Sequence, residues 1–197
     1  MMFHVEHKKK NINKTQKHTV MNNPKLLENI RVVPDFPIPG IQFQDVTTLF
    51  KDAECLQIMR KEITDLYKDK GITKIVGVES RGFVMSSVVA CDLNAGIVLC
   101  RKAGKLPADT IQMKYKKEYG EDVIEIHKDS INENDVVLLH DDLLATGGSM
   151  RAVYELVKKF NPKKIYINFI IELTIEGLNG RDAFKDTDAE ITALLKI

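Results

Sequence analysis

DVVLLHDDLLATGGSMR, residues 135–151, is the stretch of sequence around which the rest of this chain is organised. Its four consecutive apolar residues, 136–139, predict a short strand that is buried on both faces, as strands of parallel sheets are. Asp141 and Asp142 follow at the carboxyl end of that strand, and a loop of small residues leads into an amphipathic helix expected over residues 150–160. In open α/β sheets, ligands bind at the carboxyl ends of the strands, so this order predicts a site there.

The loop has the chemistry of a phosphate-binding site. Glycines allow a ligand to approach the backbone closely, and the amides at a helix start point toward an anion. Threonine and serine hydroxyl groups add further hydrogen-bond donors. The loop matches neither GxxxxGK[ST] nor GxGxxG, so it is not one of the common nucleotide-binding loops. The residues expected to bind phosphate are Ala145, Thr146, Gly147, Gly148 and Ser149.

The paired carboxylates need a different partner. They would repel a phosphate group, so Asp141 and Asp142 are expected to bind the hydroxyl groups of an attached sugar, or a divalent cation. A phosphate beside a ribose indicates a phosphorylated pentose as the ligand. The alternative is a surface turn with two solvated aspartates. The buried strand before the pair and the Thr-Gly-Gly-Ser helix start after it argue against that interpretation.

HDDLLATGGS, residues 140–149, resembles the signature of the type I phosphoribosyltransferases, and LLATGG is similar to the form found in the adenine phosphoribosyltransferases. Further matches cover nearly all of residues 31–181. The resemblance implies an α/β fold in which helices flank a mainly parallel twisted sheet, with a small N-terminal hood. It also implies a homodimeric enzyme of purine salvage that transfers the 5-phosphoribosyl group from phosphoribosyl pyrophosphate to adenine, giving AMP and pyrophosphate.

The same resemblance implies that the reaction depends on Mg²⁺. The substrate pyrophosphate would hold the metal, with no direct protein ligand, and Asp141 and Asp142 would reach it through water. Negative charge grows on the pyrophosphate as it leaves, and Arg81 and Lys105 are expected to stabilise this charge together with the metal. Glu118 is expected to act as the general acid or base toward the purine.

The length and the composition of the chain limit the folds that it can adopt. A chain of 197 residues with 44% apolar content is most simply one domain with one sizeable core. The formal net charge of +1 argues against a nucleic-acid partner, and no apolar run is long enough to span a membrane. Cys55, Cys91 and Cys100 show no CxxC spacing, which favours a reduced, cytoplasmic compartment with all three thiols in the core.

The first 23 residues differ from the rest. They hold five lysines against one glutamate and few apolar residues, so residues 1–23 are expected to form a disordered basic tail. No apolar h-region follows these charges, which argues against a secretory signal. The family-like sequence begins only after Met21, which is therefore a candidate alternative start. Residues 24–197 are expected to form a single phosphoribosyltransferase domain.

Residues 24–50 form the segment that we call the hood. Its prolines forbid regular helix and Gly40 permits a turn, which by composition alone predicts a rigid connector. However, IRVVPDFPIPGIQFQD resembles the small subdomain that covers the base in adenine phosphoribosyltransferases. The resemblance implies that the backbone of Gln42 and Gln44 reads the edge of adenine while Phe43 stacks on its ring. Gln44 stands where a basic residue is frequent in the family, a change that backbone recognition tolerates.

An amphipathic helix expected over residues 52–70 precedes a second buried strand, KIVGV at residues 74–78, and ESRG follows that strand. This segment resembles the family's pyrophosphate loop, with Ser80 in contact with substrate and Arg81 as the anion ligand. The resemblance also implies a strained peptide between Glu79 and Ser80. An arginine after a strand is often only a surface charge, and the match to xSRGF favours the functional interpretation.

Residues 101–120, which we call the lid, are charged and are interrupted by glycine and proline. An irregular run of this length is usually disordered or a functional cover, and a solvated hairpin is the plain alternative. RKAGKLP and YKKEYG resemble the two ends of the family's lid, whose arginine reaches the neighbouring subunit's site in dimeric members. The cations implied at the pyrophosphate are Arg101, Lys102 and Lys105. The residues implied near the purine are Glu118 and Tyr119.

His140 stands where the family usually has an apolar residue, and we expect it to pack at the strand end and to point away from the ribose. Another apolar strand is expected over residues 164–173. ELTIEGLNGRDAF resembles the family's closing segment, which implies that Glu172 and Leu173 lie near the base. The sequence after Arg181 indicates neither a structure nor a function.

Two other functions stay open. Hypoxanthine, guanine and orotate enzymes share the phosphoribosyl signature, and only the hood and lid matches favour adenine. A noncatalytic regulator with this fold would sense phosphoribosyl pyrophosphate. Such a regulator usually adds a DNA-binding domain, and the tail is too short and too poor in apolar residues to be one. The presence of Glu118 and of the lid motif favours the enzyme.

Overall fold

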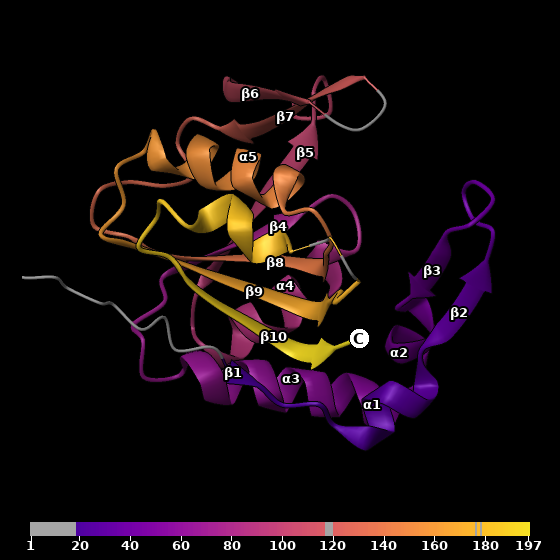
Figure 1. The fold of residues 1–197 in the computed structure, drawn as a ribbon. Coiled ribbons are helices and arrows are strands. Elements are labelled where there is room, and N and C mark those ends of the chain that lie inside the picture. The colour runs from indigo at the N-terminus through magenta and orange to yellow at the C-terminus, as the bar shows by residue number, and fades with distance from the viewer. Residues whose placement is uncertain (1–18, 117–119, 176, 178) are drawn as a thin grey trace, which may run out of the picture.

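The computed structural model describes residues 19–116, 120–175, 177 and 179–197. An eight-stranded sheet lies at the centre of the molecule (Figure 1), with the strand order β1-β10-β9-β8-β4-β5-β7-β6. Neighbours from β1 to β5 in this order pair in parallel, whereas β5–β7 and β7–β6 pair antiparallel. The mainly parallel sheet that the sequence predicts is confirmed. The strands are β1 (Thr19–Val20), β4 (Lys74–Val78), β5 (Gly96–Lys102), β6 (Thr110–Lys116), β7 (Glu121–His127), β8 (Val136–Leu144), β9 (Lys164–Glu172) and β10 (Glu190–Lys196).

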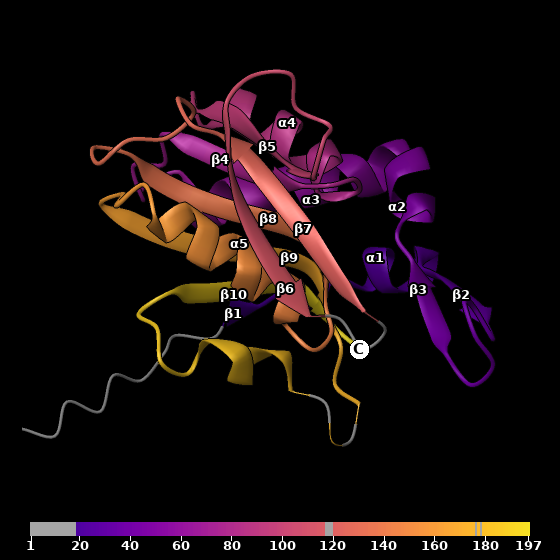
Figure 2. The ribbon, with the colours of Figure 1, turned by 90° about the horizontal axis from the view of Figure 1, so that it is seen from above.

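Helices cover both faces of this sheet (Figures 1 and 2). They are α1 (Pro24–Asn29), α2 (Thr47–Lys51), α3 (Ala53–Tyr67), α4 (Gly82–Asp92), α5 (Gly148–Lys158) and the 3-10 helix η1 (Gly180–Phe184). One core lies under α1, α3 and α4, and a second lies under α5 and η1. Because side chains alternate along a strand, Leu138 of β8 enters the first core and Val137 and Leu139 enter the second. The unbroken apolar run that predicted this strand therefore serves both cores.

The strand β8 is longer than its apolar run predicts. It continues to Leu144, so Asp141 and Asp142 lie within it rather than after it. β9 runs beside β8 to the end, with Asp141 opposite Phe169 and Leu144 opposite Glu172. The neighbouring strand extends the ladder past the apolar residues, and a pattern read along one strand does not reveal such pairing.

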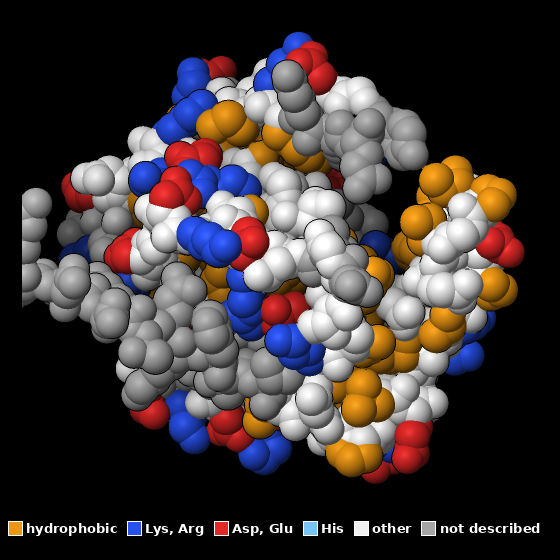
Figure 3. Space-filling model, in the orientation of Figure 1, with side chains coloured by type: hydrophobic (Ala, Val, Ile, Leu, Met, Phe, Trp, Pro, Cys, Tyr) orange, Lys and Arg blue, Asp and Glu red, His pale blue; other side chains and the backbone are white. Residues whose placement is uncertain are grey.

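The hood forms a hairpin that stands apart from the main sheet (Figure 2). β2 (Arg31–Pro34) and β3 (Gln42–Asp45) pair antiparallel, and Gly40 turns the chain between them at φ +89°. The proline-rich sequence therefore makes an extended hairpin and not only a connector. Apolar side chains gather on the hood (Figure 3). Its exposed large apolar residues are Leu27, Val32, Phe36, Ile38 and Ile41.

The lid differs from its prediction. Residues 110–116 form β6, which pairs with β7, so the longest irregular stretch in the described part of the lid is residues 103–109. The expectation of an irregular run over the whole lid is therefore wrong, because residues 110–116 form a strand. β6 alternates polar residues with apolar ones that pack against the core, a period-two pattern typical of a strand. The predicted site residues that lie outside the described residues are Glu118 and Tyr119.

The start of the described chain pairs with its last strand. β1 lies parallel to β10, and the amides of Met21 and Asn22 donate to the Leu194 carbonyl at 3.2 and 2.8 Å. The prediction of disorder is therefore wrong for residues 19–23, and residues 1–18 lie outside the described residues. β10, which holds this segment, lies in the part of the chain for which the sequence makes no prediction.

Two of the three cysteines, Cys55 and Cys100, are buried as expected. Cys91 is exposed, so its assignment to the core is wrong. The buried face of α4 carries Met85 and Val89, and residue 91 falls on its outer side. None of the helices in the described part of the chain combines the length and the apolar character needed to cross a lipid bilayer.

Candidate active site

A cavity of about 220 Å³ lies beside the carboxyl-terminal half of β8. Its lining includes Arg81, Asp141, Asp142 and every residue of the predicted phosphate loop, residues 145–149. Arg81 comes from the segment between β4 and α4, far from β8 in the sequence. The parallel pairing of β4 with β8 brings these two segments to the same edge of the sheet, as the sequence predicts.

The phosphate loop joins β8 to the start of α5, an 11-residue helix, and the amides at a helix start favour an anion. Gly147 has φ +81°, and a Cβ added there would meet the carbonyl oxygen of Gly180 and lie 2.9 Å from Ala183 Cβ. A Cβ added to Gly180 would in turn meet the carbonyl oxygen of Ala145. The two glycines therefore let the phosphate loop and η1 pack backbone against backbone.

The two aspartates have different environments. The Asp142 side chain is 6% exposed, and its Oδ2 lies 2.8 Å from Arg81 Nε. Asp141 is half-buried, and its Oδ1 accepts the Asp142 amide at 2.9 Å. Burial, and then the negative charge of Asp142, raise the pKa of Asp141 well above its ordinary value. One carboxylate is therefore matched by a cation, and the other has a raised pKa.

Arg81 connects the main sheet with the hood. Its guanidinium lies 5.3 Å from the centre of the Phe43 ring, and Phe43 meets Phe36 edge-on with 5.1 Å between the ring centres. The residue predicted to bind pyrophosphate therefore contacts both Asp142 and the residue predicted to stack on adenine. A cation over an aromatic face is a stabilising contact, and here it ties the hood to the edge of the cavity.

The other residues implied at the base and the pyrophosphate lie at the same end of the molecule. Gln44 Nε2 donates to the Gln42 carbonyl at 3.3 Å within the hood. The Leu173 amide donates to the last carbonyl of β8 at 3.0 Å, so Leu173 adjoins the cavity strand. Ser80 is exposed, and its peptide bond with Glu79 is cis, at the bond that the resemblance singles out.

The residues predicted to bind pyrophosphate from the lid gather around Glu79. Arg101 Nε donates to Glu79 Oε2 at 3.2 Å, and the Lys102 amide donates to the same oxygen at 3.1 Å. Lys105 Nζ lies 3.5 Å from Glu79 Oε1. Burial alone would raise the pKa of Glu79, and these contacts more than offset it, so the pKa lies below its ordinary value. Glu79 therefore assembles the cations at the carboxyl end of β4.

Glu172 and Arg181 form a buried ion pair that the sequence does not predict. Their side chains are 4% and 12% exposed, and Arg181 Nη2 lies 2.7 Å from Glu172 Oε2. Arg181 Nη1 also donates to the Ile191 carbonyl at 2.9 Å, which ties the end of β9 to β10. The resemblance places Glu172 near the base, and the structure engages its carboxylate with Arg181. The partners come from different elements, β9 and η1, so no helical or strand period marks them.

The described residues contain no cluster of three or more His, Cys, Asp or Glu side chains suited to a metal ion. The acidic pair offers two carboxylates, one of which is engaged by Arg81. Mg²⁺ prefers six oxygen ligands and keeps several waters. These donors alone cannot fill the coordination sphere of Mg²⁺. They therefore suit a metal ion whose remaining ligands are substrate oxygens and water molecules.

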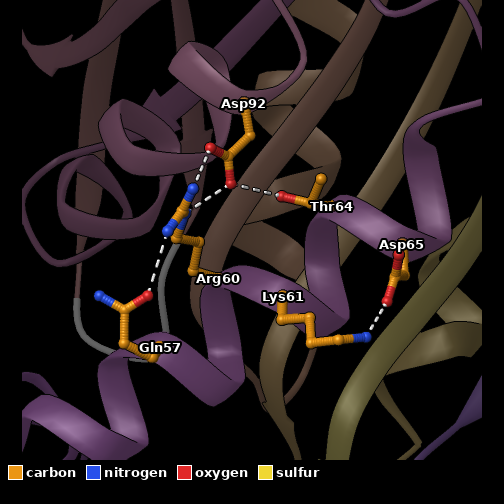
Figure 4. Close-up of a pocket in the computed structure, with 6 residues that line it drawn as sticks. All are labelled: Gln57, Arg60, Lys61, Thr64, Asp65 and Asp92. Carbon is orange, nitrogen blue, oxygen red and sulfur yellow. Dashed lines mark hydrogen bonds and ion pairs between the residues drawn. The ribbon is translucent and has the colours of Figure 1, made fainter.

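A second cavity, of about 340 Å³, lies on the outer side of α3 and α4 (Figure 4). Arg60 donates to both carboxylate oxygens of Asp92 at 2.6 Å and to Gln57 at 3.1 Å. Lys61 pairs with Asp65 at 2.5 Å. The charged groups of this cavity are paired with one another, so we interpret it as a surface ion-pair cluster.

His140 is buried and takes no part in lining the first cavity. Its Nδ1 lies 2.9 Å from Asn168 Oδ1, and Asn168 Nδ2 donates to the Thr192 hydroxyl at 2.8 Å. The Thr192 and Tyr67 hydroxyls lie 2.7 Å apart, which completes a chain of hydrogen bonds from β8 through β9 and β10 to α3. The expectation that His140 is a packing residue is confirmed, but it lies within β8 and not at its end.

We expect His140 to make the protein less stable in mild acid. Burial lowers the pKa of His140 to about 4 from an ordinary value of 6.5. Between these pH values the unfolded chain binds a proton and the folded protein does not, so stability falls as the pH falls. The free energy of unfolding should decrease by about 2 kcal/mol between pH 7.5 and 5.0 from this residue alone. Denaturant titration of the wild type and of His140→Gln, which keeps a donor for Asn168, measures the difference, and equal decreases would assign the effect to another group.

Comparison with known proteins agrees with this geometry. The family described as the phosphoribosyl transferase domain matches residues 45–189. A relative from Bacteroides fragilis, named adenine phosphoribosyltransferase, is 59% identical over 179 residues, which cover 90% of this chain and 99% of the relative.

Solved structures have the same fold. The APRTase of Giardia lamblia, complexed with 9-deazaadenine, is similar with a TM-score of 0.83 at 40% identity, over 90% of this chain and 98% of its own. The adenine phosphoribosyltransferase of Trypanosoma brucei, in complex with AMP, pyrophosphate and ribose-5-phosphate, has a TM-score of 0.80 at 28% identity, over 88% of this chain and 78% of its own. By its cavity, its sheet and these similarities, the chain belongs to the phosphoribosyltransferase family, among the adenine phosphoribosyltransferases.

Proposed function

We propose that this protein transfers the 5-phosphoribosyl group from phosphoribosyl pyrophosphate to N9 of adenine, releasing pyrophosphate and forming AMP for purine salvage. The observation that carries the proposal is the cavity in which the acidic pair, Arg81 and the phosphate loop meet. The relative of 59% identity that is named adenine phosphoribosyltransferase supports adenine as the base. So does the similarity to an enzyme complexed with 9-deazaadenine.

The two halves of the cavity would hold the phosphoribosyl group at both ends. Amides of the phosphate loop and the hydroxyls of Thr146 and Ser149 would donate to the 5-phosphate. Asp141 and Asp142 would accept hydrogen bonds from the ribose hydroxyls. These contacts would hold C1 of the ribose in place, and this positioning would supply part of the rate acceleration. As the C1–O bond breaks, positive charge grows on the sugar, and the carboxylates favour it.

The leaving pyrophosphate would meet Arg81 together with the cations that Glu79 assembles, Arg101 and Lys105. These side chains neutralise the negative charge that grows as the bond breaks. Asp141 and Asp142 would hold Mg²⁺ through water, and the metal would supply further neutralisation of the leaving pyrophosphate.

The hood and the lid would close on the base. Phe43 would stack on the adenine ring, and the backbone of Gln42 and Gln44 would read its edge. Glu118 and Tyr119 of the lid would lie near the purine, with Glu118 exchanging the proton that the reaction moves. The proposal includes a homodimer.

The test is an assay of the purified protein with Mg²⁺, phosphoribosyl pyrophosphate and, in separate reactions, adenine, hypoxanthine, guanine and orotate. We expect AMP from adenine and no nucleotide from the other bases, and no product when a chelator removes Mg²⁺. Turnover of another base would show that the hood reads a different ring. Binding of phosphoribosyl pyrophosphate without turnover of any base would favour the sensor function.

A further inference from the structure

The carboxylate of Glu125 is buried inside the lid, and the mechanism above does not use it. Glu125 lies on β7 and is 2% exposed. Its Oε1 accepts the amides of Lys105 and Leu106 at 2.9 and 3.0 Å. Its Oε2 accepts the Thr110 hydroxyl at 3.3 Å and Gln112 Nε2 at 3.1 Å. Burying a charge is costly unless its hydrogen bonds are made, and both oxygens of this carboxylate make them.

The geometry of the sheet explains why Glu125 is the anchor of this loop. Residues 103–109 connect β5 to β6, and β7 lies between these two strands, so the loop has to cross β7. Arg101 of β5 and Gln112 of β6 both stand opposite Glu125 in the sheet. Side chains of residues opposite one another lie on the same face, so Glu125 meets the loop where it crosses.

Lys105 is held by contacts with three residues. Glu125 accepts its amide at 2.9 Å, Arg101 Nη1 donates to its carbonyl at 3.1 Å, and Glu79 Oε1 lies 3.5 Å from its Nζ. A lysine side chain is flexible and loses much conformational freedom when it is fixed in a complex. Because the backbone of Lys105 is already fixed before the substrate arrives, less conformational freedom is lost when the substrate binds.

We propose that Glu125 is a positioning residue for phosphoribosyl pyrophosphate, because its carboxylate fixes the 103–109 loop so that Lys105 and Arg101 are already arranged for the pyrophosphate. This inference rests on the proposed function and adds to it a residue that acts through others. Glu125 stays charged at neutral pH. Burial alone would raise its pKa, but the hydrogen bonds from Gln112 and from the loop amides more than offset this effect.

Glu125→Gln tests the proposal with little change of shape. The amide nitrogen of glutamine would replace an acceptor oxygen that now receives N–H or O–H groups, so part of the network must break. We expect the KM for phosphoribosyl pyrophosphate and the Kd for Mg²⁺-pyrophosphate, measured by calorimetry without turnover, to rise at least about tenfold. The KM for adenine should change by less than about twofold.

Asp135→Asn is the matched control. Asp135 is a second buried carboxylate, which accepts the Thr73 hydroxyl at 2.7 Å and the Asn132 amide at 2.9 Å. It lies just before β8, at the end of the strand opposite the cavity. Asp135→Asn should lower the Tm and leave pyrophosphate binding unchanged. An effect of Glu125→Gln confined to the Tm would show that Glu125 only folds the hairpin, and would overturn the proposal.

A double variant tests whether Glu125 acts through Lys105. In a Lys105→Ala background, Glu125→Gln should weaken pyrophosphate binding by a further factor of less than about three, because the group that it positions is gone. Full additivity of the two effects on pyrophosphate binding would contradict the proposal.

If Glu125→Gln does not fold, Glu125→Asp serves as a second variant, because it keeps the charge on a shorter side chain. Glu125→Asp should still weaken pyrophosphate binding, and unchanged binding would overturn the proposal. A wild-type protein that binds neither phosphoribosyl pyrophosphate nor Mg²⁺-pyrophosphate would overturn the proposed function as well. If the wild type is active and Glu125→Gln binds Mg²⁺-pyrophosphate equally well, only the role of Glu125 would be overturned.

Discussion

Asp142→Asn should lower kcat/KM for phosphoribosyl pyrophosphate by at least about 100-fold, and Asp141→Asn should lower it far less. Asp142 is 6% exposed, and its carboxylate pairs with Arg81 at 2.8 Å. Asparagine removes the charge that matches Arg81 and that favours a cationic sugar, and it leaves the partly buried Arg81 guanidinium without its carboxylate. Asp141→Asn keeps an oxygen that can accept the Asp142 amide and leaves the ion pair intact.

Steady-state kinetics of both variants, with the Tm of each as a check on folding, measure this difference. The larger part of the Asp142→Asn loss should appear in kcat, because the charge acts on the transition state more than on the bound substrate. Equal losses in the two variants would show that the pair acts as a single charge and that the contact with Arg81 is not what distinguishes its members. Unchanged kinetics for Asp142→Asn would remove Asp142 from the site.

The core of the candidate site could be predicted from the sequence because its pattern is local. Strand, acidic pair, glycine loop and helix follow one another within residues 135–151, and each predicts its own conformation. Arg81 joins them because its own strand, β4, also ends at a short polar segment before a helix. Parallel strands end at one edge of the sheet, so two local patterns combine into one cavity.

The parts that escaped prediction depend on contacts between distant segments. β10 and β1 are held by strand pairing, and η1 is placed by the approach of Gly180 to the phosphate loop. Glu125 receives hydrogen bonds from residues 13 to 20 positions away, which no helical or strand period marks. The charge, glycine and proline of the lid predict an irregular loop, whereas residues 110–116 alternate polar and apolar side chains and form a strand.

Gly147→Ala should lower kcat/KM for phosphoribosyl pyrophosphate by at least about 100-fold, because a displacement of about 1 Å at a binding group is enough for such a loss. Gly147 has φ +81°, a conformation that costs alanine about 1–2 kcal/mol. The added Cβ would also meet the Gly180 carbonyl oxygen and lie 2.9 Å from Ala183 Cβ. Both contacts are with parts of η1 that pack closely, so the phosphate loop has to move.

Gly71→Ala separates the two causes of this loss. Gly71 follows α3 at φ +67°, and a Cβ added there would meet nothing within 4 Å. The two variants therefore share the backbone strain, and only Gly147→Ala adds the steric contact beside the cavity. Gly71→Ala should lower the Tm and leave kcat/KM unchanged, whereas Gly147→Ala should lower both and weaken binding of ribose 5-phosphate measured by calorimetry. If Gly147→Ala kept wild-type affinity for ribose 5-phosphate, the phosphate group would have to bind elsewhere than at the start of α5.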